Sequence, residues 1–67
     1  MTPEVDRIKD AFRACNSVPE VNATARHFAA EVSELESQGG DMRTMAIQIK
    51  NLAAWKRADI LRKEQRA

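Results

Sequence analysis

Apolar residues recur every three or four positions along the stretch from Asp41 to Arg66, which contains no proline and no glycine. This spacing places their side chains on one face of a helix. A helix of about 26 residues is predicted, roughly 39 Å long at 1.5 Å per residue. The members of this first stripe are Met42, Met45, Ala46, Ile49, Leu52, Ala53 and Ile60.

The same helix carries a second apolar stripe, roughly 90–160° round its axis from Met42. Its members are Ile47, Ala54, Ala58 and Leu61. Either two other helices of this chain cover both stripes, or one stripe contacts a second copy of the protein. Small helical chains often recruit a partner to complete a core, so we favour self-association. The interface candidates are Ile47, Ala54, Trp55, Ala58 and Leu61.

Three residues at the margins of these stripes leave alternatives open. Lys56 continues the spacing of the first stripe, and Asn51 falls within the second. Both are typical of the polar edges of a buried face, although a polar residue in a helical seam can also fix register and partner number. Trp55 flanks the first stripe, where it either closes the edge of the core, which we favour, or anchors an interface.

Two shorter helices are predicted before the long one, over residues 3–15 and 18–37. The first has Pro3 and Glu4 in its first turn and an apolar face that includes Val5, Ile8, Phe12 and Cys15. The second begins with a capping box formed by Ser17 and Glu20. Its apolar face alternates threes and fours without interruption: Val18, Val21, Ala25, Phe28, Val32 and Leu35.

Gly39 and Gly40 predict a tight turn between the second helix and the third, which spans residues 41–66. So short a link favours antiparallel neighbours. A DNA-reading helix-turn-helix also has a short glycine-containing turn, but its helices are shorter and cross steeply. We therefore predict an all-α fold, an antiparallel helical hairpin with a short N-terminal third helix, as one domain over residues 1–67.

Size and composition support an oligomeric, soluble protein. A chain of 67 residues buries only about 60% of its unfolded surface, and this one has two Phe, one Trp and no Tyr. The single cysteine excludes an internal disulfide framework. The sequence shows neither a secretory signal nor a continuous apolar run long enough for a membrane span, so no membrane association and a cytoplasmic location are expected.

Charge is distributed unevenly along the chain, although the net charge is +1. Residues 18–40 carry one basic and four acidic residues, whereas residues 41–67 carry seven basic and three acidic ones. The two helices can complement each other, or the basic one can meet an acidic partner. The alternative function is therefore a small nucleic-acid-binding regulator, and its candidate residues are Lys56, Arg57, Arg62 and Lys63.

Residues with catalytic chemistry are few. His27 and Glu31 lie one helical turn apart, but they supply two ligands where a catalytic zinc site uses three. Ser17 and Ser33 have no evident base beside them, and the two glycines do not form a phosphate-binding loop. We therefore expect no enzyme activity, no cofactor and no metal site.

The stretch Ala46-Ile47-Gln48-Ile49-Lys50-Asn51-Leu52, in a short chain rich in alanine and charge, resembles small helical accessory proteins of temperate bacteriophages. The resemblance covers about a tenth of the chain and carries no functional residue. It implies a host-directed or regulatory role through protein contacts. The function expected from the sequence is a non-catalytic protein-interaction module or small regulator.

Overall fold

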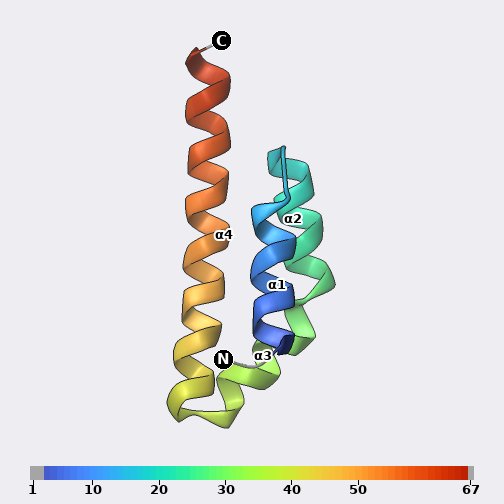
Figure 1. Ribbon diagram of the computed structural model, residues 1–67, viewed down its shortest axis with the longest axis vertical. Coiled ribbons are helices and arrows are strands. Elements are labelled where there is room, and N and C mark those ends of the chain that lie inside the picture. The colour runs from blue at the N-terminus through green and yellow to red at the C-terminus, as the bar shows by residue number, and fades with distance from the viewer. Residues whose placement is uncertain (1–2, 67) are drawn as a thin grey trace.

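Four helices make up the part of the chain that the computed structural model describes, residues 3–66 (Figure 1). They are α1 (Pro3–Arg13), α2 (Val18–His27), α3 (Ala29–Gln38) and α4 (Gly40–Arg66). No strand occurs within these residues, so the all-α prediction is confirmed. The prediction of three helices was wrong, because the expected helix over residues 18–37 is divided into α2 and α3.

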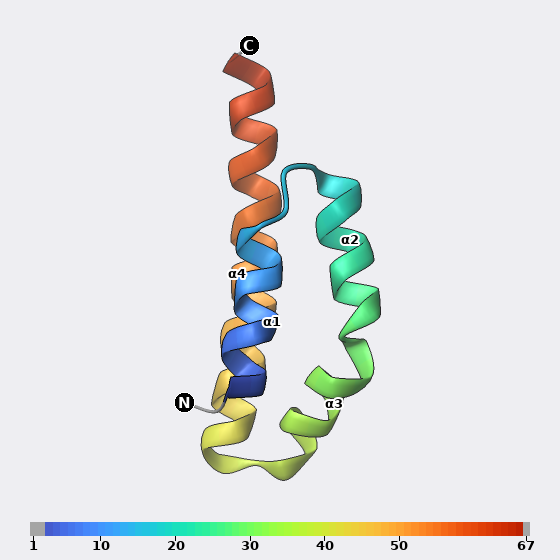
Figure 2. The same ribbon diagram turned by 45° about the vertical axis from the view of Figure 1, so that its right-hand side comes forward.

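The helices form an elongated body that measures 42 × 18 × 17 Å. α1 and α4 run in the same direction, and α2 and α3 return in the opposite direction beside them (Figure 2). α1 lies against both α2 and α4, whereas α3 packs on α4 near the turn that joins them. Both views show the C-terminal part of α4 projecting past the other helices (Figures 1 and 2).

The break between α2 and α3 falls at Phe28, whose backbone has φ −100° and ψ 7°. The N–H of Phe28 still reaches the carbonyl of Thr24, at 3.1 Å, and its own carbonyl accepts from the N–H of Val32 at 2.9 Å. The two segments meet different surfaces, because α2 lies against α1 and α4, whereas α3 lies mainly on α4 and reaches α1 through the ion pair between Arg7 and Glu31, at 3.9 Å. The change of axis at Phe28 lets each segment pack on its own set of neighbours.

Local sequence signals determine the other helix ends. The hydroxyl of Ser17 accepts a hydrogen bond from the N–H of Glu20 at 3.3 Å, which confirms the predicted cap of α2. Gly39 has φ 70° and ψ −174°, and Gly40 has φ 54°, conformations that favour glycine. α1 ends at Arg13 rather than at residue 15, and α4 begins at Gly40 rather than at residue 41.

The core lies between α4 on one side and α1, α2 and α3 on the other. The apolar face predicted for the first helix is confirmed, since Val5, Ile8, Phe12 and Cys15 are all buried, and Cys15 lies two residues beyond the end of α1. The first stripe of α4 supplies Ala46, Ile49, Ala53 and Ile60 to the same core. Within residues 3–66, no helix has the length and apolar character that crossing a membrane requires.

Candidate interaction surface

The second apolar stripe of α4 lies on the outside of the molecule. We define the outer stripe as the five residues of this face: Ile47, Asn51, Ala54, Ala58 and Leu61. At 100° per residue these positions lie about 120–180° round the helix from Ile49, which points into the core. All five side chains are exposed, and the two large ones, Ile47 and Leu61, are 43% and 48% exposed.

The outer stripe is exposed because the other three helices all pack on the opposite side of α4. The sequence left open whether the chain's own helices cover both stripes of α4. In the described part of the chain they cover the first stripe only. α4 therefore has two apolar faces, one in the core and one in solvent.

The residues of the outer stripe are spaced 4, 3, 4 and 3 apart. This is the spacing of the a and d positions in a coiled coil, with Ile47, Ala54 and Leu61 at d and Asn51 and Ala58 at a. A polar residue at one a position lowers stability but specifies register and partner number. The outer stripe thus has the pattern of a helix–helix interface as well as its apolar character.

Trp55 lies beside the outer stripe and is 56% exposed. The interpretation that Trp55 closes the edge of the core was therefore wrong. On α4 it sits about 100° round the axis from Ala54, so its indole flanks the outer stripe rather than the core. Tryptophan is enriched at the centres of protein interfaces, where a large rigid side chain is desolvated on binding.

Charged and polar residues border the outer stripe on both sides. One flank, in the g positions of the coiled-coil pattern, carries Arg43, Lys50, Arg57 and Glu64. The other flank, in the e positions, carries Asp41, Gln48, Trp55 and Arg62. Charges at e and g determine which helices pair and in which orientation.

The four basic residues proposed for nucleic-acid binding do not share one face. Lys56 is half-buried, and its Nζ donates to the main-chain oxygen of Arg13 at 3.0 Å. Arg57 Nε donates to Asn22 Oδ1 at 2.8 Å. The remaining two lie in the projecting end of α4, where Arg62 is exposed and Lys63 pairs with Asp59 at 3.1 Å. Lys56 and Arg57 thus join α4 to α1 and α2, so these four residues do not form one basic stripe.

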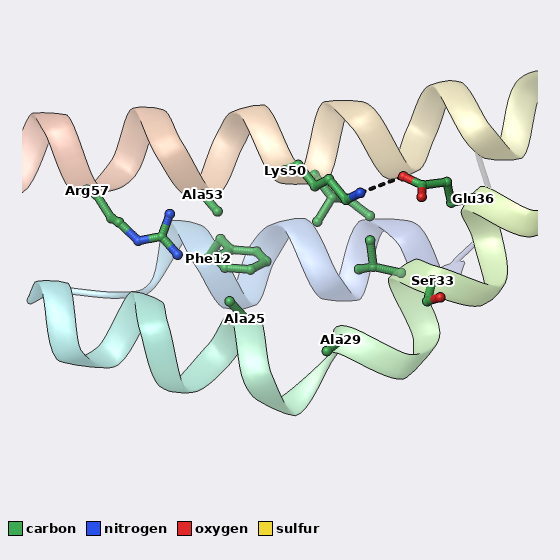
Figure 3. A pocket seen from close by; sticks show the side chains of 10 residues that line it. Phe12, Ala25, Ala29, Ser33, Glu36, Lys50, Ala53 and Arg57 are labelled. Carbon is green, nitrogen blue, oxygen red and sulfur yellow. Dashed lines mark hydrogen bonds and ion pairs between the residues drawn. The ribbon is translucent and has the colours of Figure 1, made fainter.

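A groove runs between α4 and the α2–α3 segment, with a volume of about 350 Å³ (Figure 3). Phe12 of α1 lies at its floor, and small side chains, Ala25, Ala29 and Ser33, form one edge. Arg57 and Lys50 of α4 lie along the other edge. The groove is shallow and apolar, and its polar groups are confined to the rim.

An ion pair closes one end of this groove, where Lys50 Nζ donates to the Glu36 carboxylate (Figure 3). The hydrogen bond and the charge of Lys50 hold the pKa of Glu36 below its ordinary value, and Arg43 lowers it further. Both side chains are substantially exposed, so the pair is solvated rather than buried. This ion pair links α3 to α4 near the turn that joins them.

Among the cross-helix polar contacts that were not anticipated from the sequence, two join side chains of α4 to side chains of α1 and α2. Lys9 is buried on α1, and its Nζ donates to Gln48 Oε1 of α4 at 3.1 Å. Asn22 accepts from Arg57, as described above. In both cases the partners lie 35 or more positions apart. Local spacing carries no signal for pairs so distant, so these contacts could not be predicted from helical periodicity.

Within residues 3–66 no cluster of three or more His, Cys, Asp or Glu side chains could hold a metal ion. His27 is exposed, and its ring packs edge to face with the ring of Phe28, with the two ring centroids 4.7 Å apart. Cys15 is buried, and its Sγ donates to the carbonyl oxygen of Ala11 at 3.3 Å. These residues have structural contacts that account for their positions.

Comparison of the chain with family models, with curated proteins and with solved structures yields no match. The inference of function therefore depends on the surfaces of this chain. Among those surfaces, the outer stripe of α4 combines exposed apolar area, a coiled-coil spacing and a flanking tryptophan.

Proposed function

We propose that this protein is a non-catalytic interaction module whose binding surface is the outer stripe of α4 together with Trp55. The observation that supports the proposal is the exposure of Ile47, Trp55 and Leu61 along one face of a single helix. Scattered exposed apolar residues are normal on proteins, but contiguous apolar patches mark interaction sites. Ile47 and Leu61 lie on the outer stripe with Ala54 and Ala58 between them, and Trp55 flanks the stripe, so together they form a patch on one side of α4.

Burying this face stabilises the complex that it forms. Each large apolar side chain contributes about 1.5–3 kcal/mol when fully removed from water, and the costs of association reduce that gain. A 67-residue domain is stabilised by roughly 3–10 kcal/mol in total. The free energy gained by burying this face is therefore a substantial fraction of the stability of the monomer. Self-association is the simplest use of such a face.

The proposal extends to a regulatory role, in which the same face binds a larger protein. The support for this extension is the small size of the chain and its resemblance to accessory proteins of temperate bacteriophages. A cytoplasmic, host-directed regulator of this kind needs a binding surface but no catalytic residues. The outer stripe supplies such a surface without using any core residue.

Sedimentation equilibrium from 1 to 200 µM tests the proposal. We expect a concentration-dependent mass for the parent chain and a constant monomer mass for the double variant Ile47→Lys, Leu61→Lys. Trp55 emission should shift to shorter wavelength as the parent associates, because the indole loses water. The control is Ala23→Lys with Gln38→Lys, which adds the same charge at exposed positions on α2 and α3. Equal behaviour of the two double variants would contradict the proposal.

A further inference from the structure

We infer that the occupant of the outer stripe is a second copy of this chain, with its α4 antiparallel to the first. This inference rests on the proposed function and adds the partner, its orientation and its register. In the register that overlaps the stripes most fully, facing a and d positions add up to 105, facing e positions to 103 and facing g positions to 107. The two helices then cross near residues 52 and 53, close to the middle of α4.

This register pairs a larger side chain with a smaller one in each layer. Ile47 lies against Ala58 of the second copy, and Asn51 lies against Ala54 of the second copy. Leu61 meets Thr44, whose hydroxyl already donates to the carbonyl oxygen of Gly40 at 3.3 Å and so leaves its methyl group for packing. Alternation of large and small residues across facing positions is what allows two helices to interdigitate.

The flanking charges favour the antiparallel orientation. In this register Asp41 faces Arg62 of the second copy, and Arg43 faces Glu64 of the second copy. Two-fold symmetry repeats each pair, which gives four attractive contacts along the dimer. The side chains of these four residues are exposed in the single chain and can reorient toward a partner.

One like-charge contact also results and occurs twice in the dimer, because Lys50 faces Arg57 of the second copy. Each of these side chains already has an interaction within its own chain. Lys50 is paired with the Glu36 carboxylate, and Arg57 donates to Asn22. The carboxylate of Glu36 stays beside Lys50 and offsets its charge, so the repulsion with Arg57 is reduced.

A parallel pair of α4 helices has no such compensation. Its flanking contacts would join Arg43 to Gln48, Lys50 to Trp55 and Arg57 to Arg62, none of which is attractive between charges. It would also place both acidic α3 segments at one end of the dimer and the two basic ends of α4 side by side at the other. The antiparallel pair instead brings the basic projecting end of one copy and the acidic α3 of the other to the same end of the dimer.

Charge reversal tests the pairing of residues 41 and 62. Asp41→Arg alone and Arg62→Asp alone each place two like-charge pairs in the dimer, so each should raise the dimer Kd about 10-fold at low salt. Mixing the two variants restores opposite charges in both pairs, as does the double variant Asp41→Arg, Arg62→Asp. Rescue cannot arise within one chain, because the two residues are about 32 Å apart on α4.

The orientation is measured with a spin label at Gln65, introduced as Gln65→Cys in a Cys15→Ala background. The antiparallel dimer predicts about 35–40 Å between the two labels, whereas a parallel dimer predicts less than about 20 Å. Rescue on mixing together with the long distance supports the inference. A short distance, or no rescue, overturns it.

The failure of this inference is distinguishable from the failure of the proposed function. If Ile47→Lys with Leu61→Lys abolishes a dimer whose labels are close together, the outer stripe is an interface and only the antiparallel register is wrong. If the parent chain stays monomeric at 200 µM and its outer stripe binds a different protein, the second copy is not the occupant. If substitutions in the outer stripe alter no association at all, both proposals fail.

Discussion

Ile47 and Ile49 are two residues apart on one helix, yet Ile49 is 1% exposed and Ile47 is 43% exposed. The step of two residues turns the side chain by about 200° round the axis of α4. Ile49 therefore packs against the core, and Ile47 points to solvent. Because both residues are isoleucines, the same substitution at each position tests the core face and the solvent face of α4 separately.

Ile49→Ala should destabilise the monomer by about 2–5 kcal/mol, because it leaves a cavity in a packed core. Ile47→Ala should change monomer stability by less than about 0.5 kcal/mol, since exposed substitutions cost little and alanine favours helix. Urea denaturation at low micromolar concentration, followed by circular dichroism, measures both. If Ile49→Ala does not fold, Ile49→Val replaces it, with an expected cost of about 0.5–1.5 kcal/mol.

The relative size of the two effects should reverse when association, rather than monomer stability, is measured. Ile47→Ala should weaken the dimer, whereas Ile49→Val should leave its Kd nearly unchanged at concentrations where the monomer is folded. A dimer that is equally sensitive to both substitutions would mean that association depends on the folding of the core and not on the outer stripe.

The sequence predicted the faces of the helices better than it predicted their axes. The stripe through Val21, Phe28 and Leu35 continues without a fault across the break between α2 and α3, because all three residues reach the core. Helical periodicity reports the side on which a residue lies and not the direction of the axis. The change at Phe28 depends on the different neighbours of α2 and α3, which no local pattern contains.

The same distinction applies to the candidate surface. The spacing of Ile47, Ala54 and Leu61 identified a second face, which the fold leaves exposed. Spacing alone did not reveal that Lys56 and Arg57 contact α1 and α2, because their acceptors, Arg13 and Asn22, lie 43 and 35 residues away. Roles that depend on distant partners required the packed structure.

Lys56 offers a test of one such role. Its ammonium group donates to the Arg13 carbonyl at the C-terminal end of α1, where a positive charge also suits the helix dipole. Lys56→Met should therefore cost about 0.5–1.5 kcal/mol of stability, measured by urea denaturation. Lys63→Met is the matched control, since it breaks only a pair with Asp59 in the same helix and should cost less than about 0.5 kcal/mol.

These two variants also address nucleic-acid binding, because each removes one positive charge. Binding driven by charge alone would weaken similarly for both, whereas their effects on stability should differ. A larger loss of duplex retention for Lys63→Met, at equal folded fraction, would favour the basic end of α4 as a nucleic-acid surface.

Gly39 should be the less replaceable of the two turn glycines. Its φ of 70° and ψ of −174° lie in a region that is essentially restricted to glycine, and a Cβ there would meet no atom within 4 Å. Gly39→Ala should therefore cost about 1–3 kcal/mol through backbone strain and not through a clash. Thermal unfolding of a synthetic chain with D-alanine at this position checks the cause, because D-alanine favours positive φ and should restore stability. Equal losses for L- and D-alanine would point to a steric cause instead.

Glu36 should titrate below its ordinary pKa of 4.5, because the hydrogen bond and charge of Lys50 favour the carboxylate. The folded state therefore holds this proton less tightly than the unfolded state. The stabilisation is present above about pH 4.5 and is lost as pH falls through the lowered pKa. Lys50→Gln should move the pKa of Glu36 back toward 4.5, as measured by NMR of the side-chain carboxyl carbon.

The unfolding free energy provides a second readout of the same pair. Glu36→Gln removes the titrating group, so it should flatten the decline in stability between pH 4.5 and lower pH, and 1 M salt should have a similar effect on the parent because it screens the exposed pair. Arg43 lies near enough to lower the pKa of Glu36 as well, so Lys50→Gln should leave part of the shift in place. A Glu36 carboxyl that titrates at or above 4.5 in the folded parent would show that the ion pair between α3 and α4 does not form in solution.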